Sequence, residues 1–325
     1  MPILDNKASL LEVKNLTLSF LEKNNKNYQV IFEDISFSLE ENKISALIGD
    51  SGCGKSSLAF AITGLVPSNA NISGEIFFQE KMIISNQNHH YQNFAERFSQ
   101  YQQIQDLRGN KIAIIFQDPS GALNPLHSIG SQIEESIIIH KPNISKKELN
   151  LQIKSILKMV ELESIESRLN DYPHQFSGGM RQRVMIAMAL ACKPKLLIAD
   201  EPTTALDVTI QAQILDLLND LKSQMGMSIM LITHAMGVVA ESAQRVVVMY
   251  AGRVVEEASV EKLFASPAHP YTKGLIRSIP RIDFDSDHKQ RLEAIPGSVP
   301  KLINPPMGCR FAPRCQYASD RCTQE

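Results

Sequence analysis

Hydrophobic and polar residues alternate near the N-terminus of the chain and then give way to short apolar runs. LLEVKNLTLSF and VIFEDISFSLE, separated by the polar stretch EKNNKN, have the two-residue period of antiparallel strands. KLLIAD, SIMLIT and RVVVMYAG are apolar throughout, as are strands of a parallel sheet that is buried on both faces. Helical spacing in TIQAQILDLLNDLKSQ, between two of these runs, predicts an α/β fold with a parallel-sheet core and an antiparallel β subdomain.

Other patterns interrupt the strand series. SQIEESIIIH and KKELNLQIKSILKMVEL have helical spacing, so we expect an inserted helical subdomain over about residues 122–185. A polar stretch at residues 85–105 holds His89 and His90 among asparagine and glutamine, which favours a solvated surface segment over a metal site. From about Pro280 the chain is proline-rich and poorly periodic, which indicates an appended C-terminal extension with little core of its own.

Composition restricts the classes of protein that are compatible with this chain. Its 325 residues, 43% of them hydrophobic, suffice for a large folded core. The net charge of −2 gives no general attraction to nucleic acid, so no nucleic-acid partner is expected. The best candidate span, Val184–Cys192, is about half the roughly 20 residues that cross a bilayer, and the N-terminus lacks a secretion signal. We therefore expect the chain to stay in the cytosol.

The stretch GDSGCGKS follows the apolar run KISALI and fits G-x-x-x-x-G-K-[ST] from Gly49 to Ser56. Glycine lets the backbone approach phosphate oxygens, and the following helix contributes N–H groups and the positive end of its dipole. Lys55 is expected to reach the β and γ phosphates, and Ser56 to ligate Mg²⁺. A chance glycine-rich turn is the alternative, and the strand before and the helix after disfavour it.

An apolar strand that ends in a carboxylate should complete such a site, and KLLIADEP supplies it. Asp200 at the strand end can hold the Mg²⁺ shell through water. Glu201 can polarise water for in-line attack on the γ phosphate. Two solvated acids before a proline are the alternative, which the matching phosphate-binding loop disfavours.

A second glycine-rich stretch, HQFSGGMRQRV, opens a predicted helix. Ser177, Gly178 and Gly179 would again present a hydroxyl and N–H groups to an anion at a helix N-terminus. One nucleotide does not need both surfaces from one molecule, so the second is expected to serve a partner's nucleotide. A simple serine N-cap is the alternative.

The order of these motifs resembles the ATP-binding cassette family over nearly the whole chain. Walker A lies at Gly49–Ser57, the Q-loop glutamine is Gln117, the signature is at 177–180, Walker B is at 196–201, the D-loop aspartate is Asp207 and the switch histidine is His234. The signature reads FSGGM where the family commonly has LSGGQ, and Ala235 stands where an aspartate is usual. The resemblance implies a P-loop ATPase fold and a head-to-tail pair of cassettes that sandwiches two ATP molecules.

Residue roles follow from the resemblance where the motifs match. Catalytic roles are expected for Glu201, His234 and Gln117, and Mg²⁺ contacts for Ser56, Gln117 and Asp200. Phe20 is the expected adenine-stacking aromatic, with Tyr28 second. The expected nucleotide contacts are Phe20, Gly49, Ser51, Gly52, Cys53, Gly54, Lys55, Ser56, Ser57, Ser177, Gly178, Gly179 and Asp207.

ASPAHPYTKGLIRSIPRI and the segment from IPGSVPKL to the end resemble the extension of ATPase subunits of dipeptide and oligopeptide importers. The whole pattern is most similar to the dipeptide-type subunit. We therefore expect a cassette over residues 1–265 and an extension over 266–325. The resemblance implies a second, paralogous ATPase subunit, two permease subunits, an extracellular peptide-binding protein, and a peripheral location on the cytoplasmic face of the membrane.

Some members of that subfamily hold a [4Fe-4S] cluster on four cysteines of this extension. Cys309, Cys315 and Cys322 match in kind, but a fourth cysteine is missing, and reduced cytosolic thiols are the favoured alternative. Nickel or murein peptides are alternative cargoes. Two other classes are a soluble ATPase that acts on ribosomes or DNA, and a cassette that binds nucleotide without hydrolysing it. The second is disfavoured by the presence of Lys55, Asp200, Glu201 and His234.

Overall fold

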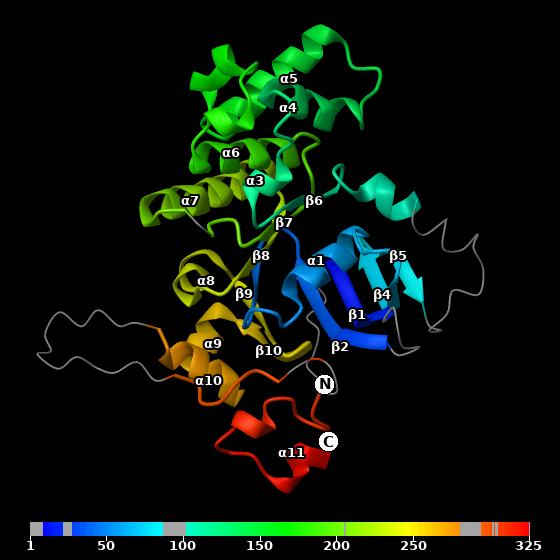
Figure 1. The fold of residues 1–325 in the computed structure, drawn as a ribbon, viewed down its shortest axis with the longest axis vertical. Helices are drawn as coiled ribbons and strands as arrows, with labels where there is room; N and C mark the ends of the chain where they lie inside the picture. The colour runs from blue at the N-terminus through cyan, green and yellow to red at the C-terminus, as the bar shows by residue number, and fades with distance from the viewer. Residues whose placement is uncertain are drawn as a thin grey trace, which may run out of the picture.

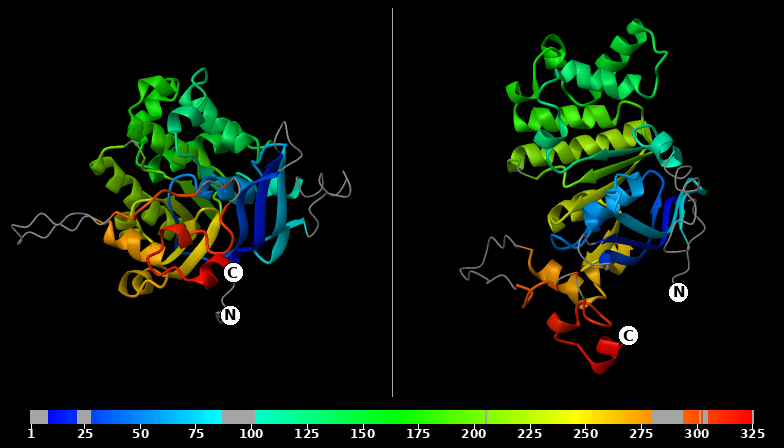
Figure 2. Two further views of the ribbon diagram at one scale, coloured as in Figure 1. Left: turned by 60° about the horizontal axis from the view of Figure 1, so that its bottom comes forward. Right: turned by 45° about the vertical axis from the view of Figure 1, so that its right-hand side comes forward.

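The computed structural model describes residues 9–21, 28–86, 102–204, 206–279, 294–300, 302 and 305–324. Two sheets meet in the middle of the molecule, with a helical layer at one end and the C-terminal segment at the other (Figures 1 and 2). This arrangement confirms the predicted α/β fold, with its parallel core, antiparallel sheet and inserted helices. The predicted polar segment with His89 and His90 falls mostly outside the described residues.

The larger sheet has the strand order β10-β9-β3-β8-β7-β6. All its neighbouring strands are parallel except the antiparallel pair β9 and β10. Alternate residues of the apolar runs enter different cores: Ile44, Ala46 and Ile48 pack with the helices, whereas Leu47 packs toward the antiparallel sheet. Burial on both faces explains why these runs contain so few polar residues. The strands are β3 (Ile44–Ile48), β6 (Ile112–Ile115), β7 (Leu196–Asp200), β8 (Ser228–Thr233), β9 (Arg245–Tyr250) and β10 (Arg253–Ser259).

The smaller sheet has the order β2-β1-β4-β5, and each of its neighbouring pairs is antiparallel. Its apolar face covers α1 (Lys55–Thr63) and one face of the larger sheet, so α1 lies buried between the two sheets (Figure 1). This packing fixes the start of α1 relative to β3. The strands are β1 (Ser9–Leu21), β2 (Tyr28–Glu40), β4 (Ala70–Phe78) and β5 (Lys81–Asn86).

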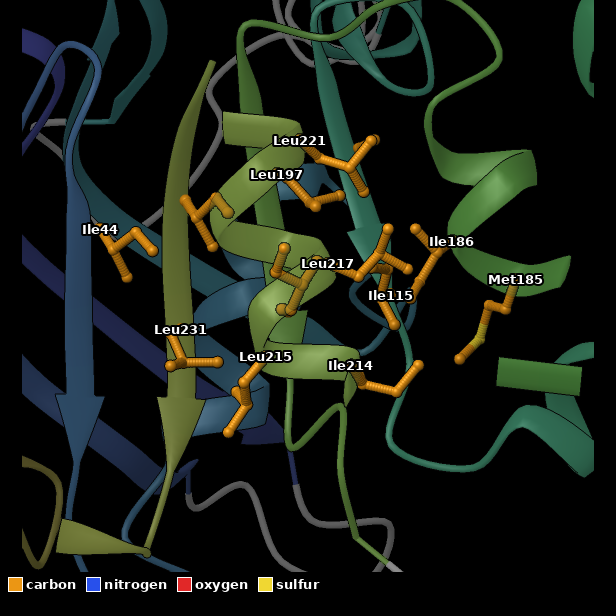
Figure 3. Packing of buried hydrophobic residues seen from close by; sticks show 14 of the residues in the cluster. Ile44, Ile115, Met185, Ile186, Leu197, Ile214, Leu215, Leu217, Leu221 and Leu231 are labelled. Carbon is orange, nitrogen blue, oxygen red and sulfur yellow. The ribbon is translucent and has the colours of Figure 1, made fainter. Parts of the chain in front are cut away.

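Helices cover the other face of the larger sheet. Figure 3 shows Leu217 and Leu221 of α7 against Leu197 of β7, with Ile186 of α6 beside Ile115 of β6. Serine side chains cap α4, α5 and α6, which explains where these helices begin. The helices of this part are α3 (Pro119–Ala122), α4 (Ile129–Ile138), α5 (Lys146–Met159), η1 (Glu163–Arg168), η2 (Pro173–Gln175), α6 (Gly178–Ala189), α7 (Val208–Met225) and α8 (Met236–Ser242).

The C-terminal part packs on the end of β9. Phe311 is buried and joins the same core as Tyr250 of β9 and Tyr271, so this part shares the core of the larger sheet. The buried Arg310 donates to the carbonyl oxygen of Ala251 and forms an ion pair with Glu33 of β2. Its elements are α9 (Val260–Ala265), α10 (Pro270–Arg277), η3 (Ala312–Arg314) and α11 (Asp320–Gln324).

Candidate nucleotide site

The sheet order places the predicted catalytic motifs at one edge. Strands β3, β8, β7 and β6 are parallel neighbours, and the phosphate loop, His234, Glu201 and Gln117 follow them in that order. Ligand sites of open α/β sheets lie at the carboxyl ends of the parallel strands. The fold therefore brings together segments that lie far apart in the sequence.

The phosphate loop, residues Gly49–Ser57, joins β3 to α1. A Cβ atom on Gly49 would lie against the carbonyl oxygen of Met249 and 2.9 Å from the sulfur of Cys53, so no larger residue fits there. Gly54 has a φ of 102° and precedes α1 with no side-chain cap. The first N–H groups of α1 therefore have no side-chain acceptor, as expected of a helix end that binds an anion.

Lys55 is buried, with only 5% of its surface exposed. Its ammonium donates to the carbonyl oxygens of Gly49 at 2.8 Å and Asp50 at 3.0 Å. The thiol of Cys53 is also buried, and burial raises its pKa. These bonds hold the Lys55 ammonium against the loop, where its positive charge could bind a phosphate. Of the loop serines, Ser51 is exposed, and Ser56 and Ser57 are half-buried.

Asp200 ends β7 beside the phosphate loop and is 3% exposed. Burial raises the pKa of its carboxyl, and a hydrogen bond with Ser56 acts in the opposite direction. Its Oδ1 atom is buried and has no hydrogen-bond partner among the described residues. A buried carboxylate oxygen without a donor, next to a serine hydroxyl, fits the oxygen ligands that Mg²⁺ prefers.

Asp200→Asn is expected to raise the melting temperature in metal-free buffer by about 2 °C, the shift for ~1 kcal/mol in a protein of this size. Folding raises the pKa of the Asp200 carboxyl above its unfolded-state value. The free energy of unfolding therefore falls as pH rises from the unfolded-state pKa to the folded-state pKa, and at neutral pH the charged carboxylate destabilises the folded protein. Thermal scans with and without Mg²⁺ and ATP measure both effects. A variant that melts at a lower temperature than the parent without metal would contradict this interpretation. So would a variant whose melting temperature rises as much as the parent's when Mg²⁺ and ATP are added.

Glu201 is the centre of a hydrogen-bonded group. Its Oε2 accepts from Gln117 Nε2 at 2.8 Å and from the Thr204 hydroxyl at 2.9 Å, and its Oε1 lies 3.1 Å from His234 Nδ1. Burial acts to raise the pKa of the Glu201 carboxyl, but the hydrogen bonds with His234 and Thr204 leave it below its usual value. Glu201 is therefore ionised at neutral pH and can accept a proton.

Two features of this group were not predicted from the sequence. Glu201 has a φ of 45°, a conformation that side-chain-bearing residues rarely adopt and that is concentrated at functional sites. Thr204 was not among the predicted site residues, although a hydroxyl three positions after Glu201 could have indicated a local bond. His234 is 62% exposed, so its other ring nitrogen can reach a ligand.

The second glycine-rich stretch starts α6 in the helical layer. Ser177 caps the helix and accepts from Met180 N at 3.3 Å, so the N-cap that was the alternative interpretation of this serine is present. A Cβ atom on Gly179 would lie 2.9 Å from Ile210, near the start of α7, which Asp207 caps. Within the described residues, Ser177, Gly178 and Gly179 form no hydrogen bond with the phosphate loop.

The candidate adenine-stacking residues lie on adjacent strands of the antiparallel sheet. Phe20, near the end of β1, is half-buried and pairs with Gln29 and Ala70. Tyr28 starts β2 and is 45% exposed. Stacking by Phe20 stays a prediction.

The three C-terminal cysteines do not form a ligand group in the described part of the chain. Cys309 N donates to the carbonyl oxygen of Cys322 at 2.8 Å, so their backbones are adjacent, yet none of the three cysteines forms a disulfide. No three histidine, cysteine or acidic side chains converge there in a way that could hold a metal ion. The residues that are described do not fit an iron–sulfur cluster, and no step below uses one.

None of the helices in the described ranges is both long and apolar enough to cross a bilayer.

Two family models match the sequence: "ABC transporter" over residues 32–204, and "Oligopeptide/dipeptide transporter, C-terminal region" over residues 255–322.

Three known proteins illustrate the similarity. The oligopeptide transport ATP-binding protein AppD of Bacillus subtilis is 49% identical over 97% of this chain and 91% of its own length. The dipeptide transport ATP-binding protein DppD of Haemophilus influenzae is 43% identical over 97% and 90%. A solved structure titled as a dimeric post-hydrolysis state of the ATP-binding cassette MJ0796 with ADP and Pi has a TM-score of 0.62 and 28% identity over 77% of this chain and 98% of its own. The chain belongs to the ABC transporter family and carries the C-terminal region of its oligopeptide/dipeptide transporters.

Proposed function

We propose that the chain is the ATP-hydrolysing subunit that energises an ABC importer of dipeptides or oligopeptides. The observation that supports this most is the ionised Glu201 carboxylate, held between Gln117 and His234 beside the phosphate loop. The matched C-terminal region supports peptides as the cargo.

ATP would be bound with its phosphates against the phosphate loop and with its adenine on Phe20. Gly49, Gly52, Gly54 and the residues Ser51, Cys53, Ser56 and Ser57 would surround the phosphates, with Lys55 supplying the fixed positive charge. Ser56, Gln117 and Asp200 would hold Mg²⁺, which neutralises charge that develops on the phosphates.

Hydrolysis would proceed by in-line attack of water on the γ phosphorus. The bond from the water oxygen to phosphorus forms as the bond to the ADP oxygen breaks, and Glu201 takes the proton that the water loses. Gln117 would orient Glu201 through the 2.8 Å hydrogen bond, and His234, whose side chain is 62% exposed, would contact the γ phosphate.

The nucleotide would be shared between two subunits. Because Ser177 and its glycines start a helix that is separate from the phosphate loop, we infer that they complete the ATP site of a second, paralogous ATPase subunit, with Asp207 at the same joint. The pair would act on two permease subunits that a peptide-binding protein supplies, with this chain peripheral on the cytoplasmic side. Residues 1–265 would form the cassette, including the helical subdomain at about 122–185, and residues 266–325 the extension.

Uptake in the source cells tests the cargo. With Lys55→Ala in place of the parent chain, uptake of a labelled dipeptide and of a labelled longer peptide is expected to fall about 10-fold or more, because ATP loses its fixed cation. Uptake of labelled nickel and of a murein tripeptide is expected to be unchanged. Loss of nickel or murein-peptide uptake alone would identify those alternative cargoes, and unchanged uptake of all four would support a regulatory cassette.

A further inference from the structure

The C-terminal part of the chain reaches the phosphate loop through one tyrosine. Tyr271 of α10 is fully buried, and its hydroxyl accepts from the backbone N–H of Asp50 at 2.9 Å. Burial raises the pKa of Tyr271, and the negative charge of the nearby Asp50 carboxylate acts in the same direction. Tyr271 therefore contacts the backbone of a loop residue that lies 221 positions earlier in the sequence.

The peptide that Tyr271 contacts also positions Lys55. The N–H of Asp50 and the carbonyl of Gly49 belong to one planar peptide unit. That carbonyl accepts from the Lys55 ammonium at 2.8 Å. The peptide is thus hydrogen-bonded to Tyr271 on one side and to Lys55 on the other, and its rotation would move the acceptor of the ammonium.

Tyr271 is itself held by neighbouring aromatic rings. Its ring centroid lies 4.6 Å from that of Tyr250 and 5.6 Å from that of Phe311. Arg314 donates to the Tyr250 hydroxyl at 3.2 Å and lies 3.7 Å from the Asp50 carboxylate. The start of α10 is anchored separately, because Glu256 accepts from the N–H groups of Ala268 and His269. These contacts leave the hydroxyl little freedom to move.

We propose that Tyr271 is a positioning residue of the ATP site: by fixing the Gly49–Asp50 peptide it aims the Lys55 ammonium, so the C-terminal extension sets the affinity for the β and γ phosphates. This inference rests on the proposed function, since it assumes that Lys55 binds ATP.

Titration of the full-length chain with mant-ATP and mant-AMP tests the proposal, because AMP lacks the phosphates that Lys55 reaches. Tyr271→Phe is expected to weaken mant-ATP binding by about 3- to 10-fold, the range for loss of one hydrogen bond, and to leave mant-AMP binding unchanged. Tyr317→Phe is the control: it removes an exposed tyrosine hydroxyl from the same C-terminal part of the chain, and should change neither affinity.

A second variant covers the case in which Tyr271→Phe folds poorly. Asp50→Ala keeps the backbone N–H but removes the partly exposed carboxylate near the Tyr271 hydroxyl, and we expect a smaller loss of mant-ATP affinity, about 2- to 5-fold, again with mant-AMP unchanged. Equal losses for both nucleotides, or unchanged mant-ATP binding in both variants, would overturn the proposal. A parent chain that fails to bind mant-ATP would overturn the proposed function and this inference with it, whereas normal binding by the parent and both variants overturns this inference alone.

Discussion

Glu201→Gln is expected to lower ATP turnover by about 100-fold or more while ATP stays bound, because a general base contributes roughly 10²- to 10⁴-fold to such a reaction. Glutamine has the shape of glutamate and can still accept a hydrogen bond from Thr204. It cannot take the proton from the attacking water. Phosphate release measured beside mant-ATP affinity separates the loss of chemistry from a loss of binding.

The matched control is Glu257→Gln on β10. The Glu257 side chain is 27% exposed, against 12% for Glu201, and it forms an ion pair with Arg245 at 2.7 Å, away from the strand ends that carry the site. We expect its turnover to stay within about twofold of the parent, since partly exposed ion pairs contribute little to stability. If Glu201→Gln hydrolysed ATP at the control's rate, the role of Glu201 as the base would be wrong.

Gly49→Ala is expected to destabilise the fold by roughly 3 kcal/mol or more and to abolish ATP binding. The new Cβ atom would press on the carbonyl oxygen of Met249 in β9, which is backbone of the central sheet and cannot move aside. The melting temperature should fall by about 6 °C or more for a loss of that size. The chain has no tryptophan, so far-UV circular dichroism is the suitable signal for unfolding.

Gly52→Ala in the same loop separates crowding from backbone strain. Gly52 has a φ of 79°, but a Cβ atom there would meet no atom within 4 Å. Only the strain of a left-handed conformation remains, about 1–2 kcal/mol, so its melting temperature should fall by about 2–4 °C. Equal effects of the two substitutions would show that contact with Met249 does not determine the requirement for glycine.

The sequence predicted those helices and strands whose residue pattern has one physical cause, such as burial on both faces of a sheet or capping of a helix. Runs such as KLLIAD and SIMLIT are apolar because both faces of the central sheet are buried, and the capping serines predict where helices begin. The phosphate loop and Asp200 could also be located, because the loop directly follows β3 and Asp200 is the last residue of β7. Their place at one edge of the sheet follows from parallel pairing.

Contacts between distant segments could not be predicted in this way. The bonds that join Glu201 to Gln117 and His234 depend on the order of β6, β7 and β8, which one sequence does not encode in any local pattern. The Tyr271 contact with Asp50 depends on how the C-terminal part folds back over β9, and a tyrosine in HPYTKG has no local signal for it. The positive φ of Glu201 likewise arises from its tertiary contacts.

Transport in proteoliposomes tests directly whether ATP hydrolysis at Glu201 drives peptide import. The chain would be assembled with its partner ATPase, both permeases and the binding protein, and labelled dipeptide uptake would be followed with Mg²⁺ and ATP on the ATPase side. We predict uptake that requires ATP and is lost in Glu201→Gln but retained in Glu257→Gln. Peptide uptake at the parent rate in Glu201→Gln, or ATP hydrolysis by the parent complex without any uptake of peptide, would contradict the account.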